Sequence, residues 1–218
     1  MRTFEDTYRH KGLRKKLVEL LQSKGITDER VLTAINTVPR HFFLDSAFDK
    51  VAYEDRAFPI AQQQTISQPY TVAYQSQLLD INPFDKVLEI GTGSAYQACI
   101  LGEMKAQVFT IERQKMLFDL NKQFPLLKKY PNVKCFFGDG FEGLPTYAPF
   151  DKVIITAAAP FVPQKLVDQM KVGGRMVIPL GEGSVQKMKR LTKLADGGMQ
   201  EEVFDNFSFV PMLEGKNN

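Results

Sequence analysis

The feature that most constrains the fold is an apolar run that ends in two closely spaced glycines, Val-Leu-Glu-Ile-Gly-Thr-Gly-Ser-Ala-Tyr at residues 87–96. A buried strand that stops at Gly91 and Gly93 can bring its backbone against a ligand, because glycine adopts positive φ and has no Cβ atom. The helix expected next offers free N–H groups at its N-terminus. The run therefore predicts a nucleotide-type cofactor site. A dinucleotide fingerprint would place a third glycine at Tyr96, which argues against a nicotinamide oxidoreductase.

From residue 71 onward, short apolar segments alternate with segments of helical length. Short buried strands separated by helices pack as a parallel sheet that is covered on both faces. An antiparallel hairpin is expected at the end, with its turn at residues 196–198. The pattern predicts an α/β, doubly wound, mostly parallel, seven-stranded Rossmann-like sheet. The expected strands are 86–90, 107–112, 133–137, 152–156, 175–180, 185–194 and 200–209, and the expected helices are 71–79, 96–105, 113–124 and 163–170.

The N-terminal part is predicted to be mainly helical, from about residue 8 to residue 60. Gly25 is a helix stop signal, Thr27 is predicted to cap a second helix, and Val38 precedes a proline that ends it. Residues 58–70 are irregular and rich in amides and hydroxyls, as in loops that line sites. We divide the chain into an N-terminal helical extension with the substrate loop (1–80), a cofactor-binding core (81–182) and a C-terminal hairpin with a substrate-lining tail (183–218), packed as one compact domain.

Charge and composition argue against nucleic-acid and membrane partners. The 218 residues carry a net charge of only +3. The densest basic run alternates with apolar residues, which is typical of the solvated face of a strand; it consists of Lys187, Lys189, Arg190 and Lys193. No stretch reaches the roughly 18 apolar residues of a membrane span, and residues 1–6 lack the apolar core of a secretion signal. We therefore expect a cytoplasmic protein.

The cysteines and histidines predict neither a metal site nor a catalytic thiol. Cys99 lies in an expected helix and Cys135 in an expected strand, without CxxC spacing. Both are expected to be reduced and buried. His10 and His41 lie far from any ligand-like cluster in the sequence, so a structural or solvent-facing role is expected for each.

Two acidic residues follow later strands. Glu112 ends the second expected strand, 19 residues beyond Gly93, where a carboxylate can accept both hydroxyls of a ribose. Asp139 lies between two glycines after the third strand and can accept a hydrogen bond from an exocyclic amine. Helix capping or solvent exposure is the alternative for Glu112, and a tight turn is the alternative for Asp139. Together with the glycine turn, they predict a mononucleoside ligand with a charged tail.

These motifs, together with Thr-Ile-Ser-Gln-Pro-Tyr at residues 65–70, resemble the protein-L-isoaspartate O-methyltransferase family. The cofactor motifs are shared by many S-adenosylmethionine-dependent methyltransferases, whereas residues 65–70 are specific to this family. Residues 38–40, 57–60, 173–175 and 209–211 also match. The resemblance implies S-adenosyl-L-methionine as cofactor and S-adenosyl-L-homocysteine as product. It also implies methyl transfer to the free carboxylate of L-isoaspartyl and D-aspartyl residues in damaged proteins and peptides, which initiates repair.

The resemblance implies roles for particular residues. Ser67 resembles the family's catalytic serine; from the sequence alone, capping of the helix that follows Pro69 is the alternative. No metal is implied, and a monomer is the default. The residues carried over to the peptide groove are Ala61, Ser67, Val210 and Pro211. Those carried over to the cofactor site are Gln64, Thr65, Ile66, Glu89, Gly91, Thr92, Gly93, Glu112, Arg113, Asp139, Gly140 and Thr156.

The chain departs from the family pattern where it replaces glycines. Ala95 follows the cofactor turn at the expected helix start, where a negative φ would make its backbone cost small. Ala61 and Gln63 replace glycines ahead of Thr65. If either position needs positive φ, the loop must follow a different path, at a cost of about 1 kcal/mol or more.

Other functions are compatible with the cofactor motifs alone. A related methyltransferase could act on a small molecule or on nucleic acid. Amino-methylating nucleic-acid enzymes are expected to carry an Asn/Asp-Pro-Pro-aromatic motif after the fourth strand, where this chain has Thr-Ala-Ala-Ala-Pro at residues 156–160. Methylation at a C5 position needs a cysteine nucleophile, and Cys99 and Cys135 lie in the wrong elements. A non-catalytic nucleoside-binding module is a further alternative.

Overall fold

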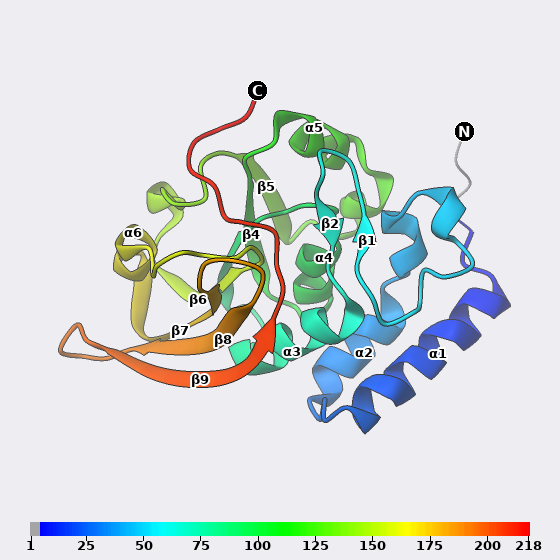
Figure 1. The fold of residues 1–218 in the computed structure, drawn as a ribbon, viewed down its shortest axis with the longest axis horizontal. Helices are drawn as coiled ribbons and strands as arrows, with labels where there is room; N and C mark the ends of the chain where they lie inside the picture. The colour runs from blue at the N-terminus through cyan, green and yellow to red at the C-terminus, as the bar shows by residue number, and fades with distance from the viewer. Residues whose placement is uncertain (1–4) are drawn as a thin grey trace.

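The computed structural model describes residues 5–218 and contains a seven-stranded sheet. The strands are β3 (Lys86–Ile90), β4 (Gln107–Glu112), β5 (Val133–Phe137), β6 (Phe150–Ile155), β7 (Met170–Leu180), β8 (Gln186–Lys193) and β9 (Met199–Phe207). Their order in the sheet is β5-β4-β3-β6-β7-β8-β9 (Figure 1). β3 to β7 pair in parallel, and β8 and β9 are antiparallel. The predicted mostly parallel, doubly wound sheet with a C-terminal hairpin is confirmed.

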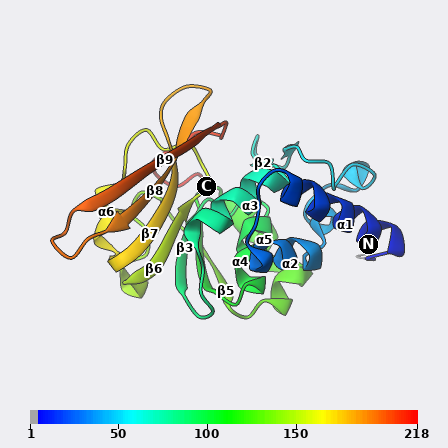
Figure 2. The same ribbon diagram turned by 90° about the horizontal axis from the view of Figure 1, so that it is seen from below.

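Helices and loops cover the two faces of the sheet, as Figure 2 shows from below. Alternate strand residues belong to different cores, so that Val87 packs with the N-terminal helices while Leu88 packs with α6. A two-stranded antiparallel hairpin, β1 (Phe58–Pro59) and β2 (Thr65–Ile66), lies outside the main sheet. The helices are α1 (Tyr8–Ser23), α2 (Glu29–Thr37), α3 (Pro69–Leu79), α4 (Tyr96–Glu103), α5 (Lys115–Gln123) and α6 (Gln164–Asp168).

The strand order places a crevice at the carboxyl ends of β3 and β6. The chain proceeds from β3 through β4 to β5 in one direction and then crosses to β6 and β7 on the other side of β3. Ligands of open α/β sheets bind at such a switch point, because the loops after the two strands diverge there. The sheet order therefore predicts a ligand site at the loops after Ile90 and Ile155.

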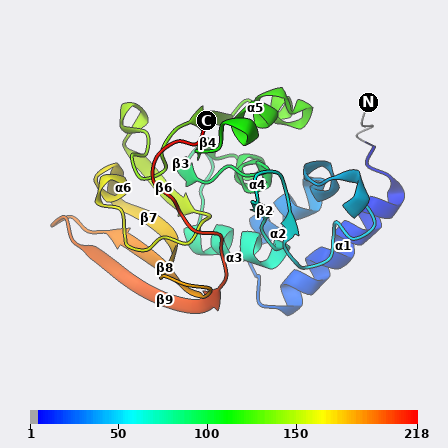
Figure 3. The same cartoon turned by 45° about the horizontal axis from the view of Figure 1, so that its top comes forward.

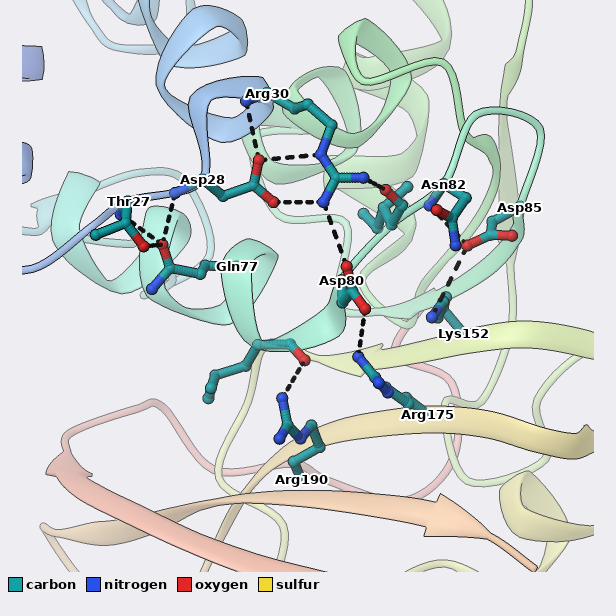
Figure 4. A network of polar contacts seen from close by, with 12 residues as sticks. Thr27, Asp28, Arg30, Gln77, Asp80, Asn82, Asp85, Lys152, Arg175 and Arg190 are labelled. Carbon is teal, nitrogen blue, oxygen red and sulfur yellow. Dashed lines mark hydrogen bonds and ion pairs between the residues drawn. The ribbon is translucent and has the colours of Figure 1, made fainter.

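A polar network joins α2 to the sheet (Figure 4). Asp28 is the N-cap of α2 and accepts the N–H of Arg30 at 2.9 Å. The Arg30 guanidinium also pairs with Asp80 after α3, and Asp80 pairs with Arg175 on β7. The predicted cap at Thr27 is therefore wrong by one residue, and the Thr27 hydroxyl instead donates to the Gln77 side chain at 3.4 Å.

His10 on α1 and His41 come together in the structure, although they are distant in sequence. The rings of His10 and His41 are buried and stacked with centroids 3.8 Å apart, and a carboxylate oxygen of Asp6 lies within 4.8 Å of a nitrogen from each ring. The prediction that no ligand-like cluster surrounds them is wrong. His10 Nε2 bonds to Asp49 at 3.0 Å and His41 Nδ1 bonds to the Tyr53 hydroxyl at 2.7 Å. These bonds fit the predicted structural role.

The cysteines lie in the predicted elements, but only one has the predicted burial. Cys99 is buried on α4, whereas Cys135 on β5 is half-buried because it lies on an edge strand. Burial raises the pKa of the Cys135 thiol to about 12, so this thiol is protonated at neutral pH. Within residues 5–218, no helix has both the length and the apolar character needed to cross a bilayer.

Candidate active site

The turn between β3 and α4 approaches the end of β6 so closely that a side chain at Gly91 would clash, and both of its glycines have positive φ. Gly91 has φ +100° and Gly93 has φ +53°. A Cβ atom on Gly91 would lie 2.7 Å from Thr156 Oγ1. The Thr156 hydroxyl donates to the Gly91 carbonyl at 2.8 Å. The backbone of the turn thus lies against the end of β6 and forms one wall of a cavity, which we call the cofactor cavity.

Glu112 at the end of β4 lines the same cavity. Its carboxylate accepts the N–H of Gly93 at 2.9 Å and the N–H of Gln114 at 2.8 Å. Burial raises the pKa of Glu112, and these backbone N–H groups offset part of that effect. The carboxylate is therefore fixed beside the glycine turn, where sequence analysis predicts the ribose acceptor, and its oxygens retain lone pairs for a ligand.

Gln97 on α4 is a lining residue of the cavity. Its Nε2 donates to the Ser76 hydroxyl at 2.9 Å, while its Oε1 is buried and has no hydrogen-bond partner among the residues that the structure describes. Buried acceptors in folded proteins are normally satisfied. Because this oxygen has almost no exposed surface, it lies within the packed wall and is not open to the cavity.

The chain after β9 closes another side of the cavity. Val210 accepts the N–H of Ala158 at 2.8 Å, and the N–H of Met212 donates back to the Ala158 carbonyl at 2.8 Å. Figure 3 shows this segment, in red, passing over the carboxyl ends of the central strands. Sequence analysis missed Met212 and Leu213, which line the cavity, because two apolar residues near the end of a chain carry no motif.

Most of the predicted cofactor residues are brought together here. Glu89 is an exception, since it lies fully buried on β3, where burial raises the pKa of its carboxyl to about 8. Asp139 is another, because it does not line the cavity; its two oxygens accept the N–H groups of Phe141 at 2.9 Å and Gly215 at 2.7 Å. The predicted residues that line the cavity are Gln64, Thr65, Ile66, Gly91, Thr92, Gly93, Glu112, Arg113, Gly140 and Thr156.

A second cavity, which we call the groove, lies between α3 and the end of β9. Tyr70, Phe207 and Phe209 give it an aromatic wall, and Asp205 adds a carboxylate. Of the residues predicted for the peptide groove, Ser67 and Val210 line it, Pro211 lines the cofactor cavity, and Ala61 lines neither. The residues that border both cavities are Thr65, Ser67, Thr156 and Val210.

The hydroxyl of Ser67 is free. Gln68, and not Ser67, is the N-cap of α3, and Pro69 is the first helical residue. Within residues 5–218, the Ser67 side chain makes no hydrogen bond. The alternative that Ser67 caps the helix therefore does not hold, and its hydroxyl is available at the junction of the two cavities.

Two of the three residues that replace family glycines, Gln63 and Ala95, have the positive φ that favours glycine, whereas Ala61 does not. Ala95 has φ +66°, so the expected negative φ is wrong: the residue is the N-cap of α4 and reverses the chain before the helix starts. Gln62 and Gln63 have φ +60° and +55°, and the N–H of Gln64 donates to the Ala61 carbonyl at 3.3 Å. A two-residue turn of type I′ has positive φ at both central positions. The strain considered for Gln63 is therefore present.

The sheet order, the glycine turn after its first strand, the acid that ends the neighbouring strand and the cavity between them define a class. In an open α/β fold these features mark a nucleoside-binding site at the switch point of the sheet, and with the family motifs they indicate the Rossmann-like S-adenosylmethionine-dependent methyltransferases. Comparison with known proteins identifies the particular family.

The family model for protein-L-isoaspartate(D-aspartate) O-methyltransferase matches residues 12–217. The protein-L-isoaspartate O-methyltransferase of Christiangramia forsetii is 52% identical over 213 residues, which cover 98% of this chain and 100% of that protein. That of Cytophaga hutchinsonii is 54% identical over 209 residues, covering 96% and 94%. The chain belongs to the protein-L-isoaspartate(D-aspartate) O-methyltransferase family.

Solved structures agree with this assignment. One protein-L-isoaspartate O-methyltransferase superposes with a TM-score of 0.82 at 25% identity, covering 91% of this chain and 65% of that one. Another, from Plasmodium falciparum and in complex with S-adenosyl-L-homocysteine, has a TM-score of 0.78 at 25% identity and covers 92% and 98%. The predicted methyltransferase family, its fold and its S-adenosylmethionine dependence are confirmed.

Proposed function

We propose that methyl transfer to the free carboxylate of L-isoaspartyl and D-aspartyl residues occurs where the cofactor cavity meets the groove, and that Ser67 orients the substrate carboxylate there. The observation that carries the proposal is the set of shared residues, because Thr65, Ser67, Thr156 and Val210 border both cavities. A methyl donor on one side and a damaged peptide on the other would meet at this boundary.

The cofactor cavity suits S-adenosylmethionine in its polar groups. The Glu112 carboxylate lines the cavity beside the glycine turn and has lone pairs for ribose hydroxyls. When bound, S-adenosylmethionine supplies a methyl group activated by a sulfonium charge. Asp139 is engaged by backbone N–H groups, so its proposed contact with adenine would use the lone pairs that remain.

The reaction needs positioning more than proton transfer. An α-carboxylate has a pKa of about 3.5 and is ionised at neutral pH, so no general base is required. This agrees with the place of the two histidines, which lie beside α1 and are absent from the walls of both cavities. The protein has to hold the nucleophile within about 3 Å of the methyl carbon and to exclude water.

A serine hydroxyl suits the task of orienting a carboxylate. Ser67 has no competing hydrogen bond among residues 5–218, so its hydroxyl can donate to a carboxylate oxygen. A hydroxyl is neutral and leaves the negative charge of the nucleophile largely intact, whereas an ammonium group would stabilise that charge strongly. Ser67 thereby fixes the direction of the nucleophile without a large loss of reactivity.

The groove fits an extended peptide of variable sequence. Aromatic side chains and the chain from Asp205 to Val210 line it. Peptides bound through main-chain hydrogen bonds make few demands on their side chains, which suits recognition of damage at many sites. Damaged proteins and peptides are the proposed partners, and a cytoplasmic monomer without nucleic-acid partners stays our prediction.

Paired peptides test this function. Labelled S-adenosylmethionine is incubated with two peptides that differ only in Asp or isoAsp at one position. We expect label on the isoaspartyl peptide, released by mild base because methyl esters hydrolyse. Equal labelling of both peptides, or labelling of RNA alone, would contradict the proposal. Cofactor binding without transfer would indicate a nucleoside-binding module.

A further inference from the structure

Asp55 is a nearly buried carboxylate in the loop ahead of β1, and the reaction as described does not use it. Its side chain is only 5% exposed, although it lies in a loop. One oxygen accepts the N–H of Tyr70 at 2.8 Å. The other accepts the Gln68 side-chain amide at 3.1 Å and the Lys24 ammonium at 2.6 Å. Asp55 thus binds the chain immediately after Ser67.

Asp55 supplies the cap that α3 lacks. The N-cap residue Gln68 makes no side-chain capping bond, and Pro69 has no N–H. The N–H of Tyr70 is therefore the first that α3 offers, and it donates to Asp55. A negative charge at a helix N-terminus is favoured by the orphan N–H groups and the helix dipole. With this cap supplied from a distant loop, the Ser67 hydroxyl is not needed for capping.

Arg40, which belongs to a family-matching segment without an assigned role, holds the Asp55 loop. Its guanidinium is fully buried and donates to the carbonyls of Ala52 at 3.1 Å and Arg56 at 3.3 Å, on either side of Asp55. Its central carbon lies 5.0 Å from the ring centroid of Tyr96. Tyr96 opens α4 and lines the cofactor cavity. The loop that carries Asp55 is therefore braced against the cofactor turn.

We propose that Asp55 is a positioning residue for methyl transfer. By holding Gln68 and Tyr70, it fixes the start of α3 so that the Ser67 hydroxyl stays at the junction of the cofactor cavity and the groove. Asp55 lines neither cavity, so it acts through the serine segment. The inference rests on the proposed role of Ser67.

The substitution Asp55→Asn keeps the size of the side chain but replaces one acceptor oxygen with a donor. That donor would face the Gln68 amide and the Lys24 ammonium. We expect kcat to fall on the order of 10-fold or more, as for a small misplacement of a reacting group, while the dissociation constant for S-adenosylmethionine is unchanged. An unchanged kcat would overturn the proposal.

Asp28→Asn is the matched control. Asp28 is also a largely buried aspartate that caps a helix and pairs with a cation, but it lies at the start of α2 and lines neither cavity. We expect this change to lower the melting temperature and to leave kcat unaltered. Equal loss of kcat in both variants would show that Asp55 contributes only to general stability, and would overturn the proposal.

A double-mutant cycle separates positioning from structure. If Asp55 acts through Ser67, Asp55→Asn should lower kcat in the wild type but have little further effect in a Ser67→Ala background. Additive losses would overturn the proposal. Full activity of Ser67→Ala alone would instead overturn the role of the serine. Should Asp55→Asn not fold, Gln68→Met removes one donor to Asp55, and the same coupling with Ser67→Ala is expected.

Discussion

The cofactor turn and the serine segment meet at one point but are held there in different ways. Gly91 and Gly93 follow β3, whose parallel register places Ile90 beside Ile111 and Ile155. Strand pairing therefore positions the turn at the crevice. Ser67 belongs to an irregular segment after β2, and buried side chains from the N-terminal extension position it. The turn depends on backbone geometry, whereas the serine depends on long-range polar bonds.

This difference predicts that substitutions in the two regions have different effects. Changes to the turn should affect cofactor affinity, because its backbone is the cofactor wall. Changes that loosen the serine segment should affect kcat, because its task is to orient a nucleophile.

Gly91→Ala should nearly abolish cofactor binding. The position has φ +100°, and the added Cβ would lie 2.7 Å from Thr156 Oγ1. Backbone strain and crowding together cost about 3 kcal/mol, on the order of 100-fold in affinity. Calorimetric titration with S-adenosylmethionine measures the loss. Gly173→Ala is the control, since Gly173 has φ +76° with nothing within 4 Å of its added Cβ. Equal loss of affinity in both variants would contradict the proposed role of the turn.

Glu89→Gln should change how stability depends on pH. Burial raises the pKa of Glu89 to about 8. Above the unfolded-state pKa of about 4.3, the unfolded chain releases this proton while the folded protein retains it until about pH 8, so stability falls as pH rises, by up to about 1.4 kcal/mol per pH unit. Denaturant unfolding from pH 5 to pH 8 should show a shallower fall for Glu89→Gln. Parallel curves would show that Glu89 does not titrate in this way.

Ala95→Gly should stabilise the fold modestly. Ala95 has φ +66°, which costs an L-residue about 1–2 kcal/mol, while glycine adds unfolded-state entropy worth about 0.4–1 kcal/mol. The net gain in the free energy of unfolding should be about 0.5–1 kcal/mol, measured by denaturant titration. Ala98→Gly, inside α4, should destabilise instead. A loss of stability in Ala95→Gly would show that the strain is relieved elsewhere.

Asp205→Asn should alter peptide preference slightly. Asp205 is an exposed carboxylate on the groove wall and accepts the Tyr74 hydroxyl at 3.3 Å. A lysine that flanks the isoaspartyl residue should gain about 0.2–1 kcal/mol from such a charge. The ratio of KM values for glutamate-flanked and lysine-flanked peptides should therefore shrink in Asp205→Asn. Asp196→Asn, in the turn of the β8–β9 hairpin, should leave the ratio unchanged. An unaltered ratio in both variants would show that the Asp205 charge does not affect peptide preference.

Sequence patterns predict the cofactor turn and its strands far better than the serine segment. The bounds of β3, β4 and β5 agree with prediction to the residue, because short apolar runs between glycines and helices have few alternatives in a parallel sheet. The cofactor residues follow those strands in order. The negative φ predicted for Ala95 is wrong, because alanine is a good helix former while the turn imposes a positive φ.

The serine segment is harder to predict. A family resemblance points to Ser67, but its release from capping depends on Asp55, which lies 15 residues before Tyr70. An aspartate in a loop carries no local signal of its tertiary partners. The same holds for the stacked histidines and for Arg40, whose neighbours come together only in the folded chain.

In the proposed mechanism, binding the cofactor and orienting the carboxylate are separate tasks, and Ser67 is responsible for the second. The most direct measurement compares kcat for an isoaspartyl peptide and the dissociation constant for S-adenosylmethionine in wild type and Ser67→Ala. Loss of a hydrogen bond to a charged group should lower kcat on the order of 10- to 100-fold and leave the dissociation constant unchanged. Equal losses in both quantities, or an unchanged kcat, would contradict the account.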